Sequence, residues 1–99
     1  MKCIDDCHNY ELEYFRGGKG SLSFYEMKEN GTKIDGVTNE ELLKVLLHRL
    51  NYLNDTWQGG KFRCRENSLA ITKIEEALMW LERRTANRVS RNVEGTHEK

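Results

Sequence analysis

The sequence predicts an α+β fold in which a small antiparallel β-sheet is followed by two α-helices. Aromatic residues alternate with polar ones between glycine-rich turns in the first third of the chain, leucines recur at helical spacing after residue 38, and a second helical pattern follows. The 99 residues suit a single domain, with the sheet region at about 8–36, the helices at 38–54 and 65–90, and a tail at 92–99.

Two stretches before residue 30 have the rough alternation of paired strands. They are YELEYFR, residues 10–16, and SLSFYEMK, residues 21–28, and the GGKG between them can reverse the chain. Asn30 and Gly31 suit the positive dihedrals of a tight hairpin, which predicts a short third strand from Thr32 to Ile34. GGKG lacks the spacing and the strand-to-helix context of a P-loop, so we interpret it as a turn.

The pattern becomes helical at Thr38. Thr38 can serve as an N-cap and Glu41 as its capping-box partner, and the leucines behind them predict a helix from about Asn39 to Asn54. The following NDTWQGGK segment breaks the helical period and places Trp57 in a loop.

The second helix carries a stripe of residues that is apolar in its middle and polar at both ends. In steps of three and four, the stripe runs Asn67, Ile71, Ile74, Leu78, Leu81, Thr85 and Arg88. Its two ends lie roughly 30 Å apart at about 1.5 Å of rise per residue, so one chain cannot close both on a small ligand. If two copies pack antiparallel in a two-fold homo-oligomer, the Asn67 end of one helix meets the Arg84 and Arg88 end of the other.

Charge is unevenly distributed although the net charge is zero. Residues 1–60 carry seven basic and ten acidic side chains, whereas residues 61–91 carry eight and four. Four arginines gather at the end of the second helix: Arg83, Arg84, Arg88 and Arg91. Such arginines can simply complement the helix macrodipole and pair with Glu75, Glu76 and Glu82. Alternatively, Arg84 and Arg88 lie one turn apart and can bind two sides of a phosphate or pyrophosphate.

Two residues near the start of the second helix complete a candidate nucleotide site. Trp57 offers a face for stacking a nucleobase, and the amide of Asn67 can both donate to and accept from a base edge or a ribose hydroxyl. Both also have structural interpretations, because Trp57 can anchor a core and Asn67 can cap an early turn. A third interpretation is nucleic-acid binding by the basic helix, which the acidic first half of the chain disfavours.

Catalysis is not predicted. His8, His48 and His97 lie in a terminus, a leucine-rich helix and a tail, and no nucleophile and base can be paired from the sequence. We therefore expect no catalytic residues and no cofactor.

The cysteines bear on metal binding and on compartment. CIDDCH contains Cys3, Cys7 and His8 and could be half of a zinc site, but zinc ligands usually form two clusters and Cys64 has no partner nearby. We expect no metal, and free thiols near a ragged amino terminus. Few cysteines, no apolar membrane span and no signal-peptide pattern predict a protein made and used in a cytoplasm.

The stretch RENSLAITKIEEALMWLERRTANRVSRNVEGTHEK, residues 65–99, resembles the C-terminal helix and tail of the Thoeris anti-defence family, small bacteriophage proteins that sequester cyclic ADP-ribose isomers. The resemblance covers roughly residues 37–99. It implies that an aromatic residue and an asparagine hold the adenine portion, and that two arginines hold the phosphates. These roles fall on Trp57, Asn67, Arg84 and Arg88, although Trp57 stands where we expect Phe in the family.

The resemblance also implies the mode of action and the partners. The expected function is that of a sponge in the host cell cytoplasm, which captures the nucleotide stoichiometrically and does not degrade it. Family members form homo-oligomers, so we expect a dimer or hexamer with pockets between protomers, and possible separate sites for cyclic di- or trinucleotides. The alternative is a small phage protein whose basic helix binds nucleic acid or an acidic host protein.

Overall fold

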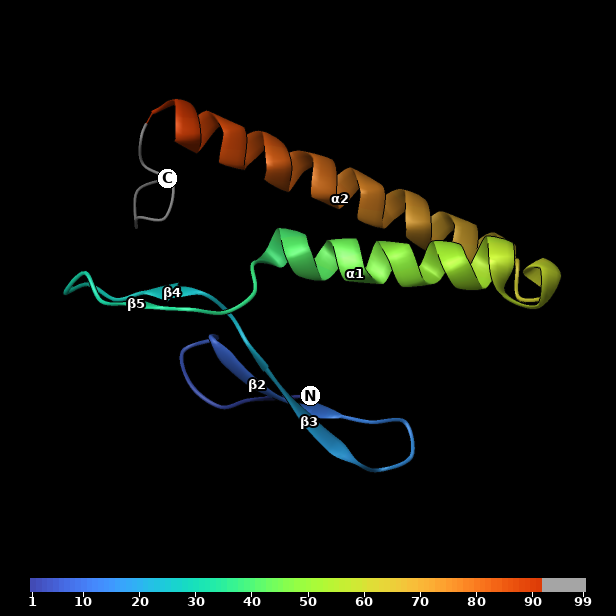
Figure 1. The fold of residues 1–99 in the computed structure, drawn as a ribbon, viewed down its shortest axis with the longest axis horizontal. Coiled ribbons are helices and arrows are strands. Elements are labelled where there is room, and N and C mark those ends of the chain that lie inside the picture. The colour runs from blue at the N-terminus through green and yellow to red at the C-terminus, as the bar shows by residue number, and fades with distance from the viewer. Residues whose placement is uncertain (92–99) are drawn as a thin grey trace. The chain divides into compact units, whose positions relative to one another are not determined.

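The computed structural model describes residues 1–91 and confirms the α+β class, since small antiparallel sheets precede the helices and the last helix is long (Figure 1). The chain divides into two compact units, one of strands over Met1–Thr38 and one of helices from Asn39 onward. Within residues 1–91, no helix is long and apolar enough to cross a membrane.

A three-stranded antiparallel sheet begins the chain. Its strands, in spatial order, are β1 (Lys2–Cys3), β2 (Asn9–Glu13) and β3 (Lys19–Ser23). Within the central hairpin, Tyr10 of β2 lies opposite Leu22 of β3. The expectation of a ragged amino terminus is wrong, because Cys3 in β1 pairs with Tyr10.

The strand predicted at residues 21–28 is divided in two. β3 ends at Ser23, and β4 (Glu26–Met27) forms a separate antiparallel pair with β5 (Lys33–Ile34). At the division, the backbone N–H of Phe24 still donates to His8 O beside β2, whereas the N–H of Tyr25 donates to Val37 O.

The hairpin predicted at Asn30 and Gly31 is confirmed. It joins β4 to β5, and Gly31 has the positive φ of 86° that favours glycine. The side chain of Asn30 fixes the turn, since its Oδ1 accepts a 2.9 Å hydrogen bond from the N–H of Thr32.

The turn between β1 and β2 is organised by Asp5. Its Oδ1 accepts hydrogen bonds from the N–H groups of His8 and Asn9, and its Oδ2 accepts one from Asn9 Nδ2 at 2.7 Å. These bonds, chiefly those from Asn9, hold the pKa of Asp5 below its ordinary value. The turn brings Sγ of Cys3 and Sγ of Cys7 to 3.9 Å as exposed free thiols.

The second unit is an antiparallel helical hairpin (Figure 1). Its segments are α1 (Asn39–Asn51), a π-helical turn (Tyr52–Thr56), a 3-10 turn (Trp57–Gly60) and α2 (Arg65–Ser90). The first helix therefore ends three residues earlier than predicted and continues into a wider turn. Trp57 begins the 3-10 turn, where an irregular loop was predicted.

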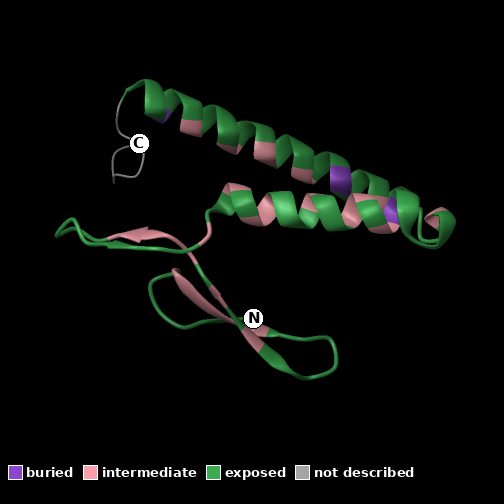
Figure 2. Ribbon diagram, viewed as in Figure 1, coloured by how far each residue is buried: buried purple, intermediate pink, exposed green. Residues whose placement is uncertain are grey.

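The predicted stripe is the inward face of α2. The buried and half-buried residues of α2 are the seven members of the stripe, and Figure 2 shows them on the side that faces α1. Ile71 is the most buried of the apolar ones, and the half-buried leucines of α1 lie on the facing side. The short connection folds the two helices against each other. The apolar middle of the stripe is thus used within the chain.

Candidate functional site

The four predicted site residues lie in two pairs at opposite ends of α2. Asn67 is in its first turn and Trp57 in the turn before it, whereas Arg84 and Arg88 are in its last two turns. The 17 to 21 residues between the pairs span roughly 25 to 30 Å of helix. Each end is therefore a separate half of the candidate site.

The Trp57 end is an aromatic stack. The indole of Trp57 lies on the ring of Phe62 with centroids 5.0 Å apart and planes 13° apart. Both side chains are only partly covered, since Trp57 is 38% and Phe62 45% exposed. Phe62 was missed from the sequence. The available signal was two aromatic residues flanking Gly59 and Gly60, which could turn the chain back so that the rings meet.

The backbone between the two rings adopts left-handed conformations. Gln58, Gly59 and Gly60 have φ values of 49°, 69° and 80°. Glycine takes this region without steric cost, so the paired glycines make the reversal possible. Gln58 is the one member of this run that carries a side chain in a conformation that L residues disfavour.

Asn67 is tied to this stack. Its Nδ2 donates a 2.9 Å hydrogen bond to Phe62 O, and its backbone N–H donates to Cys64 Sγ at 3.4 Å, which makes Cys64 the N-cap of α2. The predicted capping role thus belongs to Cys64. Among residues 1–91, no donor bonds to Asn67 Oδ1, so this oxygen can accept from a ligand.

A buried asparagine holds the connection between the helices. Asn54 is 5% exposed; its Oδ1 accepts from the N–H of Cys64 at 3.2 Å, and its Nδ2 donates to Ser68 Oγ at 3.3 Å. Arg63 adds a bond from Nε to Asn54 O at 3.4 Å and an ion pair with Asp55 at 3.3 Å. These contacts fix both sides of the segment that presents the aromatic stack.

The other end of α2 is a cavity lined largely by arginines. Its volume is about 480 Å³, and its lining residues are Trp80, Arg83, Arg84, Asn87, Arg88 and Arg91. Arg88 is 4% exposed and is the one buried charged side chain within residues 1–91. Two contacts shape the wall: the Arg83 guanidinium lies 5.5 Å from the centre of the Trp80 ring, and Arg91 Nε donates to Asn87 Oδ1 at 3.0 Å.

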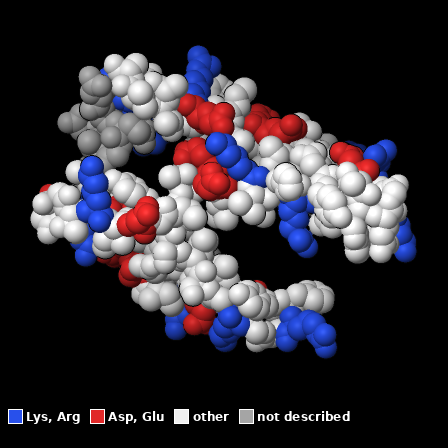
Figure 3. Space-filling model, in the orientation of Figure 1, with Lys and Arg blue, Asp and Glu red and all other residues white. Residues whose placement is uncertain are grey.

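Two of the glutamates that the sequence offered as partners for these arginines form ion pairs with lysines. Glu82 pairs with Lys44 at 3.9 Å and Glu76 with Lys73 at 3.8 Å, and Figure 3 shows acidic side chains over the middle of the helical unit. Within the described part of the chain, no carboxylate lies within ion-pair distance of Arg83 or Arg84. The guanidinium groups of Arg83 and Arg84 therefore contribute a positive potential that attracts anions such as phosphates.

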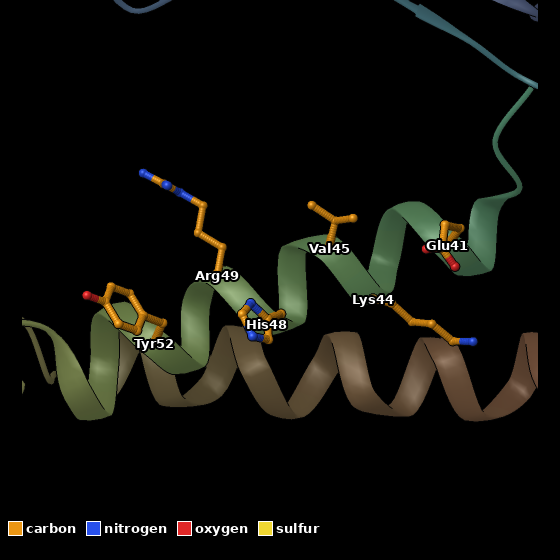
Figure 4. A pocket seen from close by; sticks show the side chains of 6 residues that line it. All are labelled: Glu41, Lys44, Val45, His48, Arg49 and Tyr52. Carbon is orange, nitrogen blue, oxygen red and sulfur yellow. The ribbon is translucent and has the colours of Figure 1, made fainter.

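A third surface lies on the outer side of α1. A cavity of about 740 Å³ is lined by Glu41, Lys44, Val45, His48, Arg49 and Tyr52. Figure 4 shows Val45, Arg49 and Tyr52 pointing away from α2, while Lys44 points toward it. Val45 is 57% and Tyr52 47% exposed, so the strip is apolar with mixed charges at its edges. Its lining has fewer arginines than the cavity at the end of α2 and includes the carboxylate of Glu41, and the sequence did not single it out.

Comparison with known proteins places this chain in a family. A sequence model described as Acb2/Tad1, hairpin domain matches residues 26–86. A relative named Thoeris anti-defense 1, from Bacillus phage SBSphiJ7, is 57% identical over 87 residues, which are 86% of this chain. The matched part is 57% of that relative's length, so the chain spans little more than half of it. The family match includes Trp57, Asn67 and Arg84 and ends two residues before Arg88.

Proposed function

This chain belongs to the Acb2/Tad1 family of Thoeris anti-defence proteins, and we propose that it serves phage anti-defence by sequestering a cyclic ADP-ribose-type signalling nucleotide without degrading it. The observation that carries the proposal is the chemistry of the two ends of α2. One end offers an exposed aromatic face beside an amide, and the other offers a cavity with four arginines. A nucleotide of this class has a purine, which matches the first end, and a pyrophosphate, which matches the second.

The two ends belong to one pocket only in an assembly of two chains. Asn54 bonds Ser68 near one end of the hairpin, and Lys44 pairs with Glu82 near the other, so α1 begins near the level of Arg84. The two helices therefore lie alongside each other, and the two halves of the candidate site stay at opposite ends of α2. In a two-fold homo-oligomer, the arginine cavity of one protomer lies beside the aromatic stack of its partner, and two equivalent pockets result.

Each residue has a distinct role in the proposed pocket. The outer face of Trp57 stacks on the adenine, and Asn67 Oδ1 accepts from the exocyclic amine or from a ribose hydroxyl. Arg84 and Arg88 hold the phosphates through charge-assisted hydrogen bonds, for which planar guanidinium groups are well suited. Nothing in this set acts as a nucleophile or a base, so the ligand is held and not converted.

The proposed site of action is the cytoplasm of the infected cell, where the signal has to be removed from its receptor. A dimer supplies the composite pockets and a hexamer would repeat them. The proposal includes cyclic di- and trinucleotides as a further class of ligand, because their phosphates suit the same type of basic surface. It assigns no residues to a separate site for them.

Two parallel titrations test the proposal. We expect a cyclic ADP-ribose isomer to give saturable heat in calorimetry, and random duplex DNA to give little at 150 mM salt, where about an 8 Å screening length weakens diffuse attraction. Binding of the duplex alone would instead favour the alternative, a basic helix that docks on nucleic acid.

A further inference from the structure

Phe62 makes contact with both residues proposed to hold the base. Its ring stacks on Trp57 at 5.0 Å between centroids, and its carbonyl oxygen accepts the 2.9 Å hydrogen bond from Asn67 Nδ2. The three residues therefore form one connected group, although they come from the 3-10 turn, the connection and the first turn of α2.

Stacking against Phe62 leaves Trp57 one face for a ligand. The near-parallel planes, 13° apart, cover the inner face of the indole, while 38% of the residue is exposed. A solitary exposed indole would have to lose rotational freedom when a base stacks on it, and that loss weakens binding. An indole that is already held by a second ring has lost part of this rotational freedom during folding, so ligand binding reduces it less.

The hydrogen bond from Asn67 Nδ2 to Phe62 O holds Phe62 and the Asn67 amide in fixed positions relative to each other. It sets the position of the Phe62 backbone relative to α2 and, at the same time, orients the Asn67 amide so that Oδ1 points away from the bonded Nδ2. The orientation of the ring that receives the base and the orientation of the acceptor beside it thus depend on the same residue.

We propose that Phe62 is a positioning residue that pre-organises Trp57 for stacking with the purine base of the ligand. The inference rests on the proposed function, because it concerns the end of that site that binds the purine. Phe62 acts through Trp57 and does not itself touch the base, which separates it from the four residues predicted from the sequence.

A double-mutant cycle measures this coupling directly. Aromatic pairs contribute about 0.5 to 1.5 kcal/mol beyond their buried area, so Phe62→Leu is expected to weaken binding of a cyclic ADP-ribose isomer by roughly 2- to 12-fold. In a Trp57→Leu background, the same change should alter affinity by less than about 2-fold, because the ring that Phe62 positions is gone.

Three controls accompany the cycle. Phe62→Tyr keeps the ring and should bind like the wild type. Phe15→Leu removes a ring of the same type that is fully exposed in the strand unit, and should leave affinity unchanged. Melting curves establish that each variant folds; if Phe62→Leu does not, Phe62→Met replaces it in the same cycle.

The outcomes separate this inference from the function on which it rests. Equal losses from Phe62→Leu in both backgrounds, no loss in either, or a loss with Phe62→Tyr as large as with Phe62→Leu would each overturn the positioning role while wild-type binding persists. Absence of binding by the wild-type protein would overturn the proposed function, and the inference with it.

Discussion

Asn54→Ala is expected to destabilise the helical hairpin more than any other asparagine replacement in that unit. The side chain is 5% exposed and bonds two groups on the far side of the connection, the N–H of Cys64 at 3.2 Å and Ser68 Oγ at 3.3 Å. Each hydrogen bond contributes about 0.5 to 1.5 kcal/mol, and a polar group left unsatisfied costs about 1 to 3 kcal/mol. We therefore expect the free energy of unfolding to fall by about 2 to 3 kcal/mol.

The assay is urea unfolding followed by far-ultraviolet circular dichroism, at one fixed protein concentration because assembly also contributes to stability. Asn51→Ala is the matched control. Its Nδ2 donates only to Leu47 O within the same helix, at 2.9 Å, and alanine is the better helix former, so we expect a change within about 0.5 kcal/mol. Equal destabilisation by the two variants would refute the structural role assigned to Asn54.

The remaining predictions concern the arginine cavity and the assembly. Arg84→Ala should weaken ligand binding roughly 10- to 150-fold, the equivalent of about 1.5 to 3 kcal/mol for a hydrogen bond to a charged group, with an unchanged melting temperature; Arg16→Ala, in the strand unit, should do neither. Arg88→Ala should lower both affinity and melting temperature, because this side chain is 4% exposed; a loss of affinity without a change in melting would show that the buried guanidinium does not stabilise the fold. Light scattering at micromolar concentration should show at least a dimer, and a well-folded monomer that still binds ligand would exclude the composite pocket.

The long helix was predictable because its pattern is strong and continuous. Steps of three and four residues from Asn67 to Arg88 picked out the face that the structure buries, including its two polar ends. The start of α1 was equally clear, since Thr38 and Glu41 have the spacing of a capping box and α1 begins at Asn39. Local chemistry decided both features, and no knowledge of distant contacts was required.

Features that depend on contacts between distant residues were not predictable. β1 is only two residues long, and it exists because Cys3 pairs with Tyr10, which no local pattern reveals. The stack of Trp57 on Phe62 depends on left-handed backbone between the two residues. From the sequence, the stripe of α2 could have packed against a second copy of the chain as readily as against α1. Periodicity shows which face is buried but not what covers it.

The most direct test of sequestration is a quantitative capture and release measurement. Purified protein is incubated with a cyclic ADP-ribose isomer, freed of unbound ligand by gel filtration, and denatured by heat, and the released nucleotide is measured by mass spectrometry. Two equivalent pockets in a dimer predict about one ligand per protomer, recovered with its mass unchanged. Recovery of a hydrolysed, linear product would contradict capture without degradation, and recovery of no nucleotide would contradict binding itself.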